Sequence, residues 1–262
     1  TDNTYLIGVD TGFFLNALLS RGRPPETFFD QQYYVDTRSS FKDYLAGVDA
    51  IVHLAAISND PMGKAYESVT GEINTNASVD LARAAADMHV GRFVFASSCS
   101  VYGDGSSEPR KEEHELNPLT AYARSKIDAE RGLESLSREI DTEIICMRFA
   151  TACGYSDRLR LDLVLNDFVA SSAISGEINI LSDGTPLRPL IHVRDMSRAM
   201  SWAAAAQPSL SDNGFTVLNV GFNDWNFTVL QIAESVSKVT GSKISVNPDA
   251  PEDKRSYQVD FS

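Results

Sequence analysis

Tyr122 and Lys126 are the two residues of this chain whose types and spacing best suit proton transfer. On a helix, side chains four apart share a face, so the ammonium of Lys126 would lie beside the phenol of Tyr122. A nearby cation favours the phenolate and lowers the pKa of a tyrosine from about 10, as a base for an alcohol proton requires. The alternative is an amphipathic helix with a solvated lysine and a half-buried tyrosine, and the spacing alone favours that alternative.

A serine-rich turn lies 24 residues before Tyr122. The apolar run from Arg92 to Ala96 predicts a buried strand, and it leads directly into Ser97 and Ser98. Ligands of open α/β sheets bind outside the carboxyl ends of strands, where a serine hydroxyl can bond a substrate oxygen. The alternative is that these hydroxyls bond only their own backbone.

Alternating strands and helices must position these residues. The hydrophobic pattern predicts strands at 5–9, 33–36, 50–56, 92–96 and 142–148, and helices at 74–89 and 119–139. This alternation predicts an α/β fold with a Rossmann-like, doubly wound parallel sheet. After Gly154 the alternation weakens, which indicates a smaller interleaved C-terminal lobe. Its predicted elements are helices at 161–174, 196–206 and 229–240 and strands at 178–181 and 217–221.

Composition narrows the class of protein. The 262 residues carry a net charge of -13, and no apolar run reaches the roughly 18–20 residues that span a bilayer. Nucleic acid or an anionic membrane as the main partner is therefore not expected, because both require a basic face. Three cysteines, Cys99, Cys146 and Cys153, are too few for a disulfide scaffold and lack the spacing of a zinc site. We expect a cytoplasmic protein without a signal peptide or a metal.

Several short motifs, in this order and at these spacings, carry a resemblance that runs along nearly the whole chain. They are Val9 to Gly12, Val52 to Ala56, Ser97 to Gly103, Tyr122-x-x-x-Lys126, Arg148 to Gly154, Ser182 to Arg188, His192 to Asp195 and Asn219 to Gly221. Together they resemble the extended short-chain dehydrogenases/reductases, in particular the NAD-dependent nucleotide-sugar epimerase/dehydratase group.

The resemblance implies roles for individual residues. Tyr122 would be the base and acid on a sugar hydroxyl, Lys126 would tune it and hold the nicotinamide ribose, and Ser98 would bond the same sugar oxygen. The cofactor would be NAD, with Asp10 accepting hydrogen bonds from the adenosine ribose and repelling the 2′-phosphate of NADP. The full set implied for NAD is Asp10, Asp36, Leu54, Ala55, Ala56, Asn74, Tyr122, Lys126 and Thr151. The set implied for the substrate is Ser98, Cys99, Ser100, Asn166, Arg188 and Arg255, with Lys254 as an alternative to Arg255.

The same resemblance implies a division of the chain. Residues 1–155, with about 190–222, would form the NAD-binding Rossmann domain, and 156–189 with 223–262 the substrate-binding lobe. The family's glycine-rich phosphate loop, G-x-x-G-x-x-G, does not occur in the 262 residues, and only nine residues precede Asp10. The segment from Tyr5 matches a second strand of the family, so we expect that the residues carrying the loop are missing from this chain, which would then bind cofactor poorly.

The expected function is that of an NAD-dependent epimerase acting on a nucleotide-diphosphate sugar through a transient 4-keto sugar, in a homodimer. One alternative is a 4,6-dehydratase or a 4-ketosugar reductase on the same scaffold. Dehydratases of this family carry Asp-Glu directly after the catalytic hydroxyl residue, whereas this chain has Cys99 and Ser100 there. A second alternative is a catalytically silent nucleotide-binding relative, although Ser98, Tyr122 and Lys126 together argue for an enzyme.

Overall fold

The computed structural model describes residues 4–19, 22–103, 108–205, 213–247 and 255–262. Its centre is a parallel sheet of four strands in the order β3-β4-β5-β9. These strands are β3 (Ala50–His53), β4 (Arg92–Ser98), β5 (Glu143–Phe149) and β9 (Phe215–Val220). Every residue of β5 is buried, which is why that strand is apolar nearly throughout. The structure confirms the predicted α/β fold with a parallel sheet.

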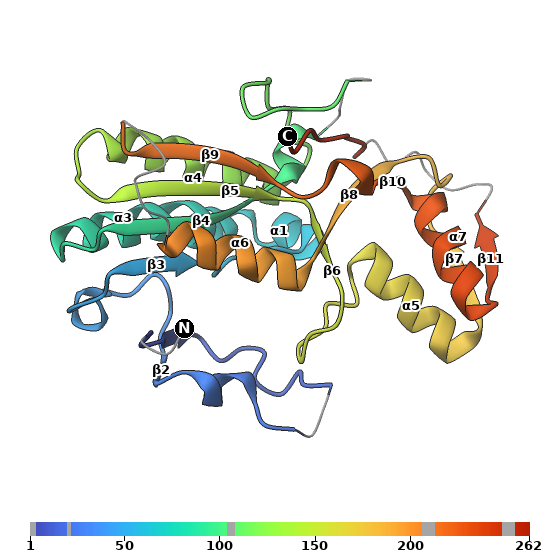
Figure 1. Ribbon diagram of the computed structural model, residues 1–262, viewed down its shortest axis with the longest axis horizontal. Coiled ribbons are helices and arrows are strands. Elements are labelled where there is room, and N and C mark those ends of the chain that lie inside the picture. Colours follow the sequence, from blue (N-terminus) through green and yellow to red (C-terminus); the bar gives the residue numbers. More distant parts are fainter. Residues whose placement is uncertain (1–3, 20–21, 104–107, 206–212, 248–254) are drawn as a thin grey trace.

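Helices cover both faces of this sheet (Figure 1). Successive strand residues point to opposite faces, so Phe93 and Phe95 of β4 pack with α3 (Ala77–Asp87) and α4 (Ala121–Ser137), whereas Val94 faces α6 (Val193–Ala205). The predicted helices at 74–89, 119–139 and 196–206 correspond to these three. The carboxyl ends of the parallel strands β4 and β5 point toward the smaller lobe, and Ser98 is the last residue of β4 at that end.

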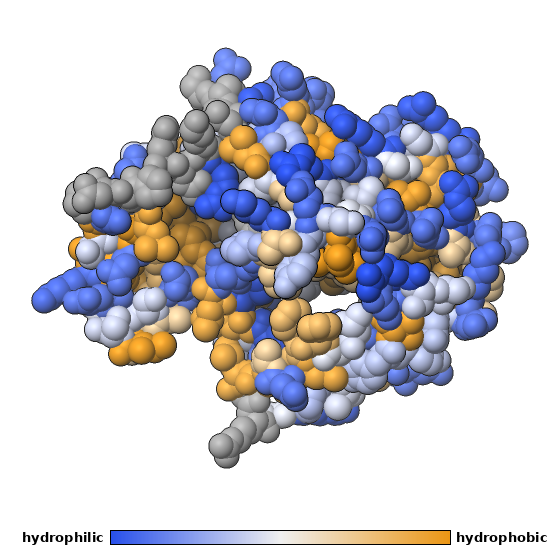
Figure 2. All heavy atoms as spheres, turned by 180° about the vertical axis from the view of Figure 1, so that it is seen from behind, coloured by the Kyte–Doolittle hydropathy of each residue, from blue (hydrophilic) through white to orange (hydrophobic). Residues whose placement is uncertain are grey.

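The N-terminal segment forms a separate parallel pair, β1 (Ile7–Asp10) and β2 (Gln31–Tyr34), accompanied by the short helices η1 (Pro25–Phe28) and η2 (Lys42–Tyr44). Within the described residues, β3 is hydrogen-bonded to β4 alone, so its other edge has no strand partner. Figure 2 shows an opening between the N-terminal segment, at the bottom of the view, and the body of the protein above it.

Two predictions for this half of the chain were wrong in detail. The second strand occupies 31–34 rather than 33–36, because Asp36 starts a turn in which its carboxylate accepts the backbone N–H of Arg38. Ahead of α3 the chain forms α1 (Asp60–Ala65), α2 (Glu67–Gly71) and a π-helical turn, η3 (Glu72–Asn76). The sequence pattern missed α1 and α2 because both are too short for a helical period to be recognised.

The smaller lobe packs α5 (Val164–Ser175) and α7 (Val229–Thr240) against β7 (Glu177–Ile180) and β11 (Lys243–Val246), at the right of Figure 1. It has a core of its own, which includes Phe168, Ile178 and Ile232. Three strands join it to the main sheet: β6 (Thr151–Cys153), β8 (Leu187–His192) and β10 (Asn226–Thr228), in the order β10-β8-β6. The remaining short helices are η4 (Cys99–Tyr102) and η5 (Asn223–Trp225). In the described ranges, no helix combines the length and apolar character needed to cross a bilayer.

Candidate active site

The carboxyl end of β4 continues directly into the turn η4, which carries Ser98 to Tyr102. Ser98 begins this turn, and its side-chain oxygen accepts the backbone N–H of Ser100 at 3.2 Å. The turn ends at Gly103, whose φ of +61° is one that glycine adopts without strain. Cys99 is buried, and its thiol donates to the carbonyl oxygen of Arg148 at 3.1 Å. Burial raises the pKa of this thiol, so Cys99 is a neutral, hydrogen-bonded side chain.

Helix α4 brings Tyr122 and Lys126 to the same place. Thr120 caps the helix by accepting the N–H of Ala123 at 3.1 Å, so Tyr122 lies in the first turn. The Nζ of Lys126 lies 5.8 Å from the centre of the Tyr122 ring and donates to the carbonyl oxygen of Ala96 at 2.8 Å. The shared helix face predicted from the spacing is present. The alternative of a solvated lysine is wrong, because Lys126 is only 2% exposed.

The electrostatic environment of Lys126 is unusual for a lysine. Burial lowers its pKa to about 8, and the nearby Glu130 partly opposes this effect. The ammonium also lies 4.5 Å from the centre of the Phe95 ring, which stabilises a cation in a desolvated site. Because Ala96 is two residues before Ser98, the Lys126 contact ties the helix that carries Tyr122 to the strand that carries Ser98.

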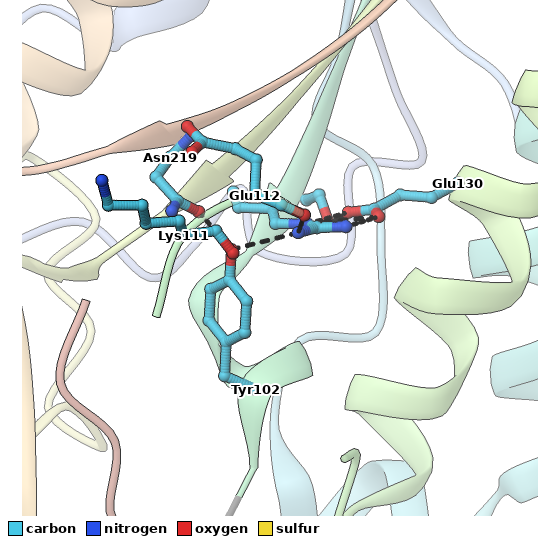
Figure 3. Close-up of polar contacts among 7 residues, drawn as sticks. Tyr102, Lys111, Glu112, Glu130 and Asn219 are labelled. Atoms are coloured by element: carbon cyan, nitrogen blue, oxygen red, sulfur yellow. Dashed lines mark hydrogen bonds and ion pairs between the residues drawn. The ribbon is translucent and has the colours of Figure 1, made fainter. Parts of the chain in front are cut away.

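A buried polar network surrounds this junction (Figure 3). Arg148 forms an ion pair with Glu130 at 2.7 Å and donates to the hydroxyl of Tyr102 at 3.0 Å. The Tyr102 hydroxyl in turn donates to Asn219 at 2.7 Å. Sequence reasoning missed Glu130. The available signal was its spacing, since Tyr122, Lys126 and Glu130 follow one another at intervals of four.

Asn74 is expected beside a dinucleotide, and the structure buries it completely. Its amide oxygen accepts the N–H of Ile57 at 2.8 Å, and its amide nitrogen donates to the Ile57 carbonyl at 2.9 Å and to the Ser125 hydroxyl at 2.9 Å. Asn74 therefore fastens the loop after β3, which contains Leu54 to Ala56, to helix α4. Its role toward a cofactor stays a prediction, and the contacts favour an indirect one through this loop.

Asp10 and Asp36 lie at or just beyond the carboxyl ends of β1 and β2. Asp10 is exposed, and its carboxylate accepts the N–H of Gly12 at 2.6 Å. Asp36 pairs with Arg38 at 2.7 Å, and the hydrogen bonds from Arg38 lower the pKa of Asp36 to about 2. Both carboxylates accept a backbone N–H in a turn, and both have oxygen lone pairs that could accept further hydrogen bonds.

The other residues predicted for the substrate, Asn166, Arg188 and Arg255, lie where the smaller lobe joins the sheet domain. Asn166 accepts the N–H of Gly154 at 3.1 Å and donates to the Arg160 carbonyl at 3.0 Å, so its amide holds the loop between β6 and α5. Arg188 on β8 donates to the carbonyl oxygens of Leu187 and Arg255, which places these two arginines side by side. Lys254 lies outside the described residues.

One further residue at this entrance was not predicted. Tyr257 is buried, and its hydroxyl is hydrogen-bonded to the side chain of Thr151, one of the residues predicted for NAD. The phenol also interacts electrostatically with Arg188 and Tyr122, and burial raises its pKa. No local pattern marks Tyr257, because its neighbours belong to strands and a helix more than a hundred residues earlier in the chain or to β8.

The chemistry of these side chains suits the two ribose ends of a dinucleotide. The exposed carboxylate of Asp10 can accept vicinal ribose hydroxyls, and the ammonium of Lys126 with the phenol of Tyr122 suits a second ribose. Within the described residues, the hydroxyl of Ser100 is a buried polar atom without a hydrogen-bond partner. It can therefore donate a hydrogen bond to a ligand oxygen. The 262 residues contain no glycine-rich loop for the pyrophosphate. The described part of the chain also shows no group of three His, Cys, Asp or Glu side chains placed to hold a metal ion.

The sequence of this chain is similar to those of known proteins. The family model described as "NAD dependent epimerase/dehydratase family" matches residues 20–221. The UDP-glucose 4-epimerase of Lactobacillus helveticus is 26% identical over 211 residues, which are 75% of this chain and 63% of the relative. The UDP-glucose 4-epimerase of Drosophila melanogaster is 26% identical over 231 residues, 79% of this chain and 63% of the relative. The chain thus spans about three fifths of the length of these curated relatives.

Solved structures agree on the fold. MoeE5 in complex with UDP-glucose and NAD superposes with a TM-score of 0.82 at 25% identity, covering 99% of this chain and 82% of the other. The UDP-N-acetylglucosamine 4-epimerase from Methanobrevibacter ruminantium M1, in complex with UDP-N-acetylmuramic acid, gives a TM-score of 0.82 at 21% identity, covering 99% and 90%. The second similarity, at this identity, supports the fold alone.

Proposed function

This chain belongs to the NAD-dependent epimerase/dehydratase family, and we propose that it epimerises the sugar of a nucleoside diphosphate sugar at C4. The observation that carries the proposal is the meeting of β4 and α4, which brings Ser98, Tyr122 and the buried ammonium of Lys126 to one edge of the sheet. Uridine is the base to test first, because the relatives and the MoeE5 complex that resemble this chain are named for UDP-sugars.

In the proposed mechanism, Tyr122 takes the proton of the sugar 4-hydroxyl. The ammonium of Lys126 stabilises the phenolate that this requires, and Ser98 bonds the same sugar oxygen. When NAD is bound, it supplies reversible acceptance of the hydride from the same carbon. Tyr122 returns the proton once the 4-keto sugar has presented its other face, so the phenol serves as base and then as acid.

The residues proposed to hold NAD are Asp10 at the adenosine ribose and Tyr122 with Lys126 at the nicotinamide ribose. The loop Leu54 to Ala56, Asp36, Asn74 and Thr151 would line the path between these ends. A carboxylate at Asp10 repels the 2′-phosphate of NADP, so NAD is the proposed cofactor. Arg188 and Arg255, which lie side by side on the smaller lobe, are proposed to pair with the substrate diphosphate.

The contacts of Cys99 weigh against a dehydratase. Elimination of water needs a proton donor and an acceptor beside Ser98, and the thiol of Cys99 is turned toward the carbonyl of Arg148 in a buried site. We also propose a cytoplasmic location, which the three free, buried cysteines support and fractionation tests. The homodimer is proposed from the resemblance to the family alone and is tested by light scattering.

Tyr122→Phe tests the function directly. The purified protein is incubated with a panel of UDP-, dTDP- and GDP-sugars, the products are separated, and any dinucleotide released on denaturation is identified. We expect a 4-epimer product, with the rate reduced about 10²–10⁴-fold in Tyr122→Phe because only the proton-transfer group is lost. Tyr155→Phe, a change at a tyrosine that is 64% exposed, is the matched control and should keep the native rate. Turnover of Tyr122→Phe near the native rate would refute the mechanism, and absence of any 4-epimer even with excess added NAD would support a silent binding protein.

A further inference from the structure

Glu130 lies one helical turn after Lys126 on α4, and its carboxylate reaches across to two neighbouring strands. It accepts the hydroxyl hydrogen of Ser97 on β4 and both the Nε and Nη2 hydrogens of Arg148 on β5. Ser97 and Arg148 are register partners in the sheet. One carboxylate therefore binds the side chains of two paired residues on adjacent strands, and one of these residues, Ser97, directly precedes Ser98.

The network continues at this level to a third strand. Arg148 is also the register partner of Asn219 on β9, and the hydroxyl of Tyr102 joins the two side chains at 3.0 and 2.7 Å. Figure 3 shows Tyr102 pointing into this cluster, with Glu130 on its far side. Because Tyr102 closes the turn that starts at Ser98, the network holds both ends of that turn.

Helix α4 is consequently attached to β4 at two adjacent points. Lys126 donates to the carbonyl of Ala96, and Glu130 accepts from the side chain of Ser97, the next residue. The four participants Lys126, Glu130, Ser97 and Arg148 are each at most 5% exposed. Lys126 and Tyr122 precede Glu130 on the same face, so the position of Glu130 along the sheet sets where the lysine and the tyrosine lie.

The balance of charge around Lys126 points to the same residue. Two buried cations, Lys126 and Arg148, adjoin one buried carboxylate, that of Glu130. The other titratable groups that face Lys126 in the described structure are Tyr122 on its own helix, Cys146 on β5 and His53 on β3. Burial raises the pKa of Cys146 and lowers that of His53 to about 3, so both are neutral at neutral pH.

We propose that Glu130 is a positioning residue of the active site, which keeps the amine of Lys126 protonated and holds Lys126 and the Ser98 turn in register. It acts through Lys126 and Ser97, without touching the reacting atoms itself. This inference rests on the proposed function, because the role of Glu130 depends on the proposed roles of Tyr122 and Lys126.

The chain offers a matched control at the opposite end of the same two strands. Arg92 on β4 and Glu143 on β5 are register partners that form a second buried ion pair, with side chains 8% and 9% exposed. Glu143→Gln removes a buried carboxylate from the same sheet, far from Lys126. Any effect of Glu130→Gln that reflects only the loss of a buried ion pair should therefore appear in Glu143→Gln as well.

The first measurement is a titration of Lys126 by NMR in protein containing isotope-labelled lysine. The chain has only seven lysines, so their signals can be resolved. Loss of the adjacent negative charge should lower the pKa of Lys126 in Glu130→Gln by about one pH unit or more, with no change in Glu143→Gln. An unchanged pKa of Lys126 in Glu130→Gln would overturn the proposal. Because Glu130→Gln leaves Arg148 without its counter-ion, the double variant Glu130→Gln/Arg148→Met provides a second measurement. A smaller fall in the pKa of Lys126 is expected there, because loss of the neighbouring Arg148 cation partly offsets loss of the carboxylate.

The second measurement is the pH profile of turnover in the same variants. A lower pKa of Lys126 means that the amine loses its proton at lower pH, so the alkaline limb of kcat should move to lower pH in Glu130→Gln. For a fall of one unit in the pKa of Lys126, the rate should drop about 2-fold near pH 7 and on the order of 10-fold at about pH 9, while Glu143→Gln retains the native profile. A native profile in Glu130→Gln would also overturn the proposal. If the unmodified protein converts no nucleotide sugar, the proposed function fails, and the NMR titration still decides the role of Glu130.

Discussion

Cys99 shows at the scale of a single residue how burial decides chemistry. Its neighbour Ser98 caps the turn η4, which is proposed to belong to the active site, so position alone would allow the thiol to act in an elimination. The thiol is completely buried, its hydrogen is directed to the Arg148 carbonyl, and burial raises its pKa. A thiol in that state packs as a small apolar side chain and transfers no proton near neutral pH.

Cys99→Ala should therefore reduce the epimerisation rate only slightly, by less than about 5-fold, because it removes packing and one weak hydrogen bond. Rates with the accepted nucleotide sugar would be measured beside those of Tyr122→Phe. A Cys99→Ala variant as inactive as Tyr122→Phe would show that the thiol is a proton donor, and a dehydratase would then replace the epimerase as the preferred function.

At the scale of elements, the site depends on how β3, β4 and their following loops are locked to the helices. His53 ends β3, is 5% exposed, and lies 2.9 Å through Nε2 from the hydroxyl of Ser78 on α3. The turn after β4 is locked in another way, since the backbone of Asn117 runs against Gly103 and donates its N–H to the carbonyl of Val101 at 3.1 Å. Each lock has a separate test.

His53 makes stability depend on pH with a definite sign. Burial lowers its pKa to about 3 from 6.5, so below pH 6.5 the unfolded chain binds a proton that the folded protein does not. The contribution of neutral, buried His53 to the unfolding free energy is complete above pH 6.5 and is lost as the pH falls toward 3. Between pH 7.5 and 5 the unfolding free energy of the native protein should drop by about 2 kcal/mol more than that of His53→Gln. Urea denaturation at the two pH values measures this, and parallel losses in both proteins would contradict it.

Gly103→Ala should disrupt the turn η4, which Gly103 ends. The glycine has φ +61° and ψ -109°, and an added Cβ would lie 1.6 Å from the carbonyl oxygen of Asn117. We expect a loss of at least about 3 kcal/mol of unfolding free energy by urea denaturation. Gly176→Ala, at φ +71° with open space around the new Cβ, is the control and should cost only about 1 kcal/mol. Equal losses in the two variants would show that the backbone of Asn117 moves to make room for the added methyl group.

At the scale of the whole molecule, polar contacts connect the loop leading into the smaller lobe to the sheet domain. Arg160 donates to the hydroxyl of Ser58 at 2.8 Å and pairs with Asp162 at 2.7 Å, while Asn59 donates to Asp162 at 2.9 Å. Hydrogen bonds from Arg160 lower the pKa of Asp162 to about 2. Arg160 also interacts with Tyr122, so this bridge crosses close to the proposed reaction centre. These contacts attach the loop before α5 to the loop after β3.

Asp162→Asn should loosen this bridge without unfolding the protein. Amide hydrogen exchange should become faster in residues 155–163 and around Ser58, while the unfolding free energy changes by less than about 1 kcal/mol, because the pair is partly exposed. Glu134→Gln, which breaks an exposed pair with Arg138 on α4, should leave exchange in 155–163 unchanged. Native exchange rates there in Asp162→Asn would mean that other contacts hold the loop.

Local chemistry was sufficient to predict part of this protein. The interval of four between Tyr122 and Lys126 places their side chains on one helix face whatever the rest of the chain does. The apolar runs that became β4 and β5 identify a buried parallel sheet, because such strands are covered on both faces. The apolar run of β3 lies at the sheet edge, where Val52 is 39% exposed. Family motifs then pointed to the Ser98 turn.

Tertiary structure alone decided the partners of these residues. Glu130 meets Ser97 across 33 residues of sequence, and Asn74 meets Ser125 across 51, because strand order and register bring the elements together. The interval of four puts Glu130 on the helix face of Lys126, but the sequence does not show that this face is buried or which strands it meets. From the sequence, Glu130 therefore resembles one more charge on a solvated helix face. Whether Lys126 is solvated or buried depended likewise on the sheet beneath α4, since only desolvation by a packed neighbour lowers the pKa of an amine in this way.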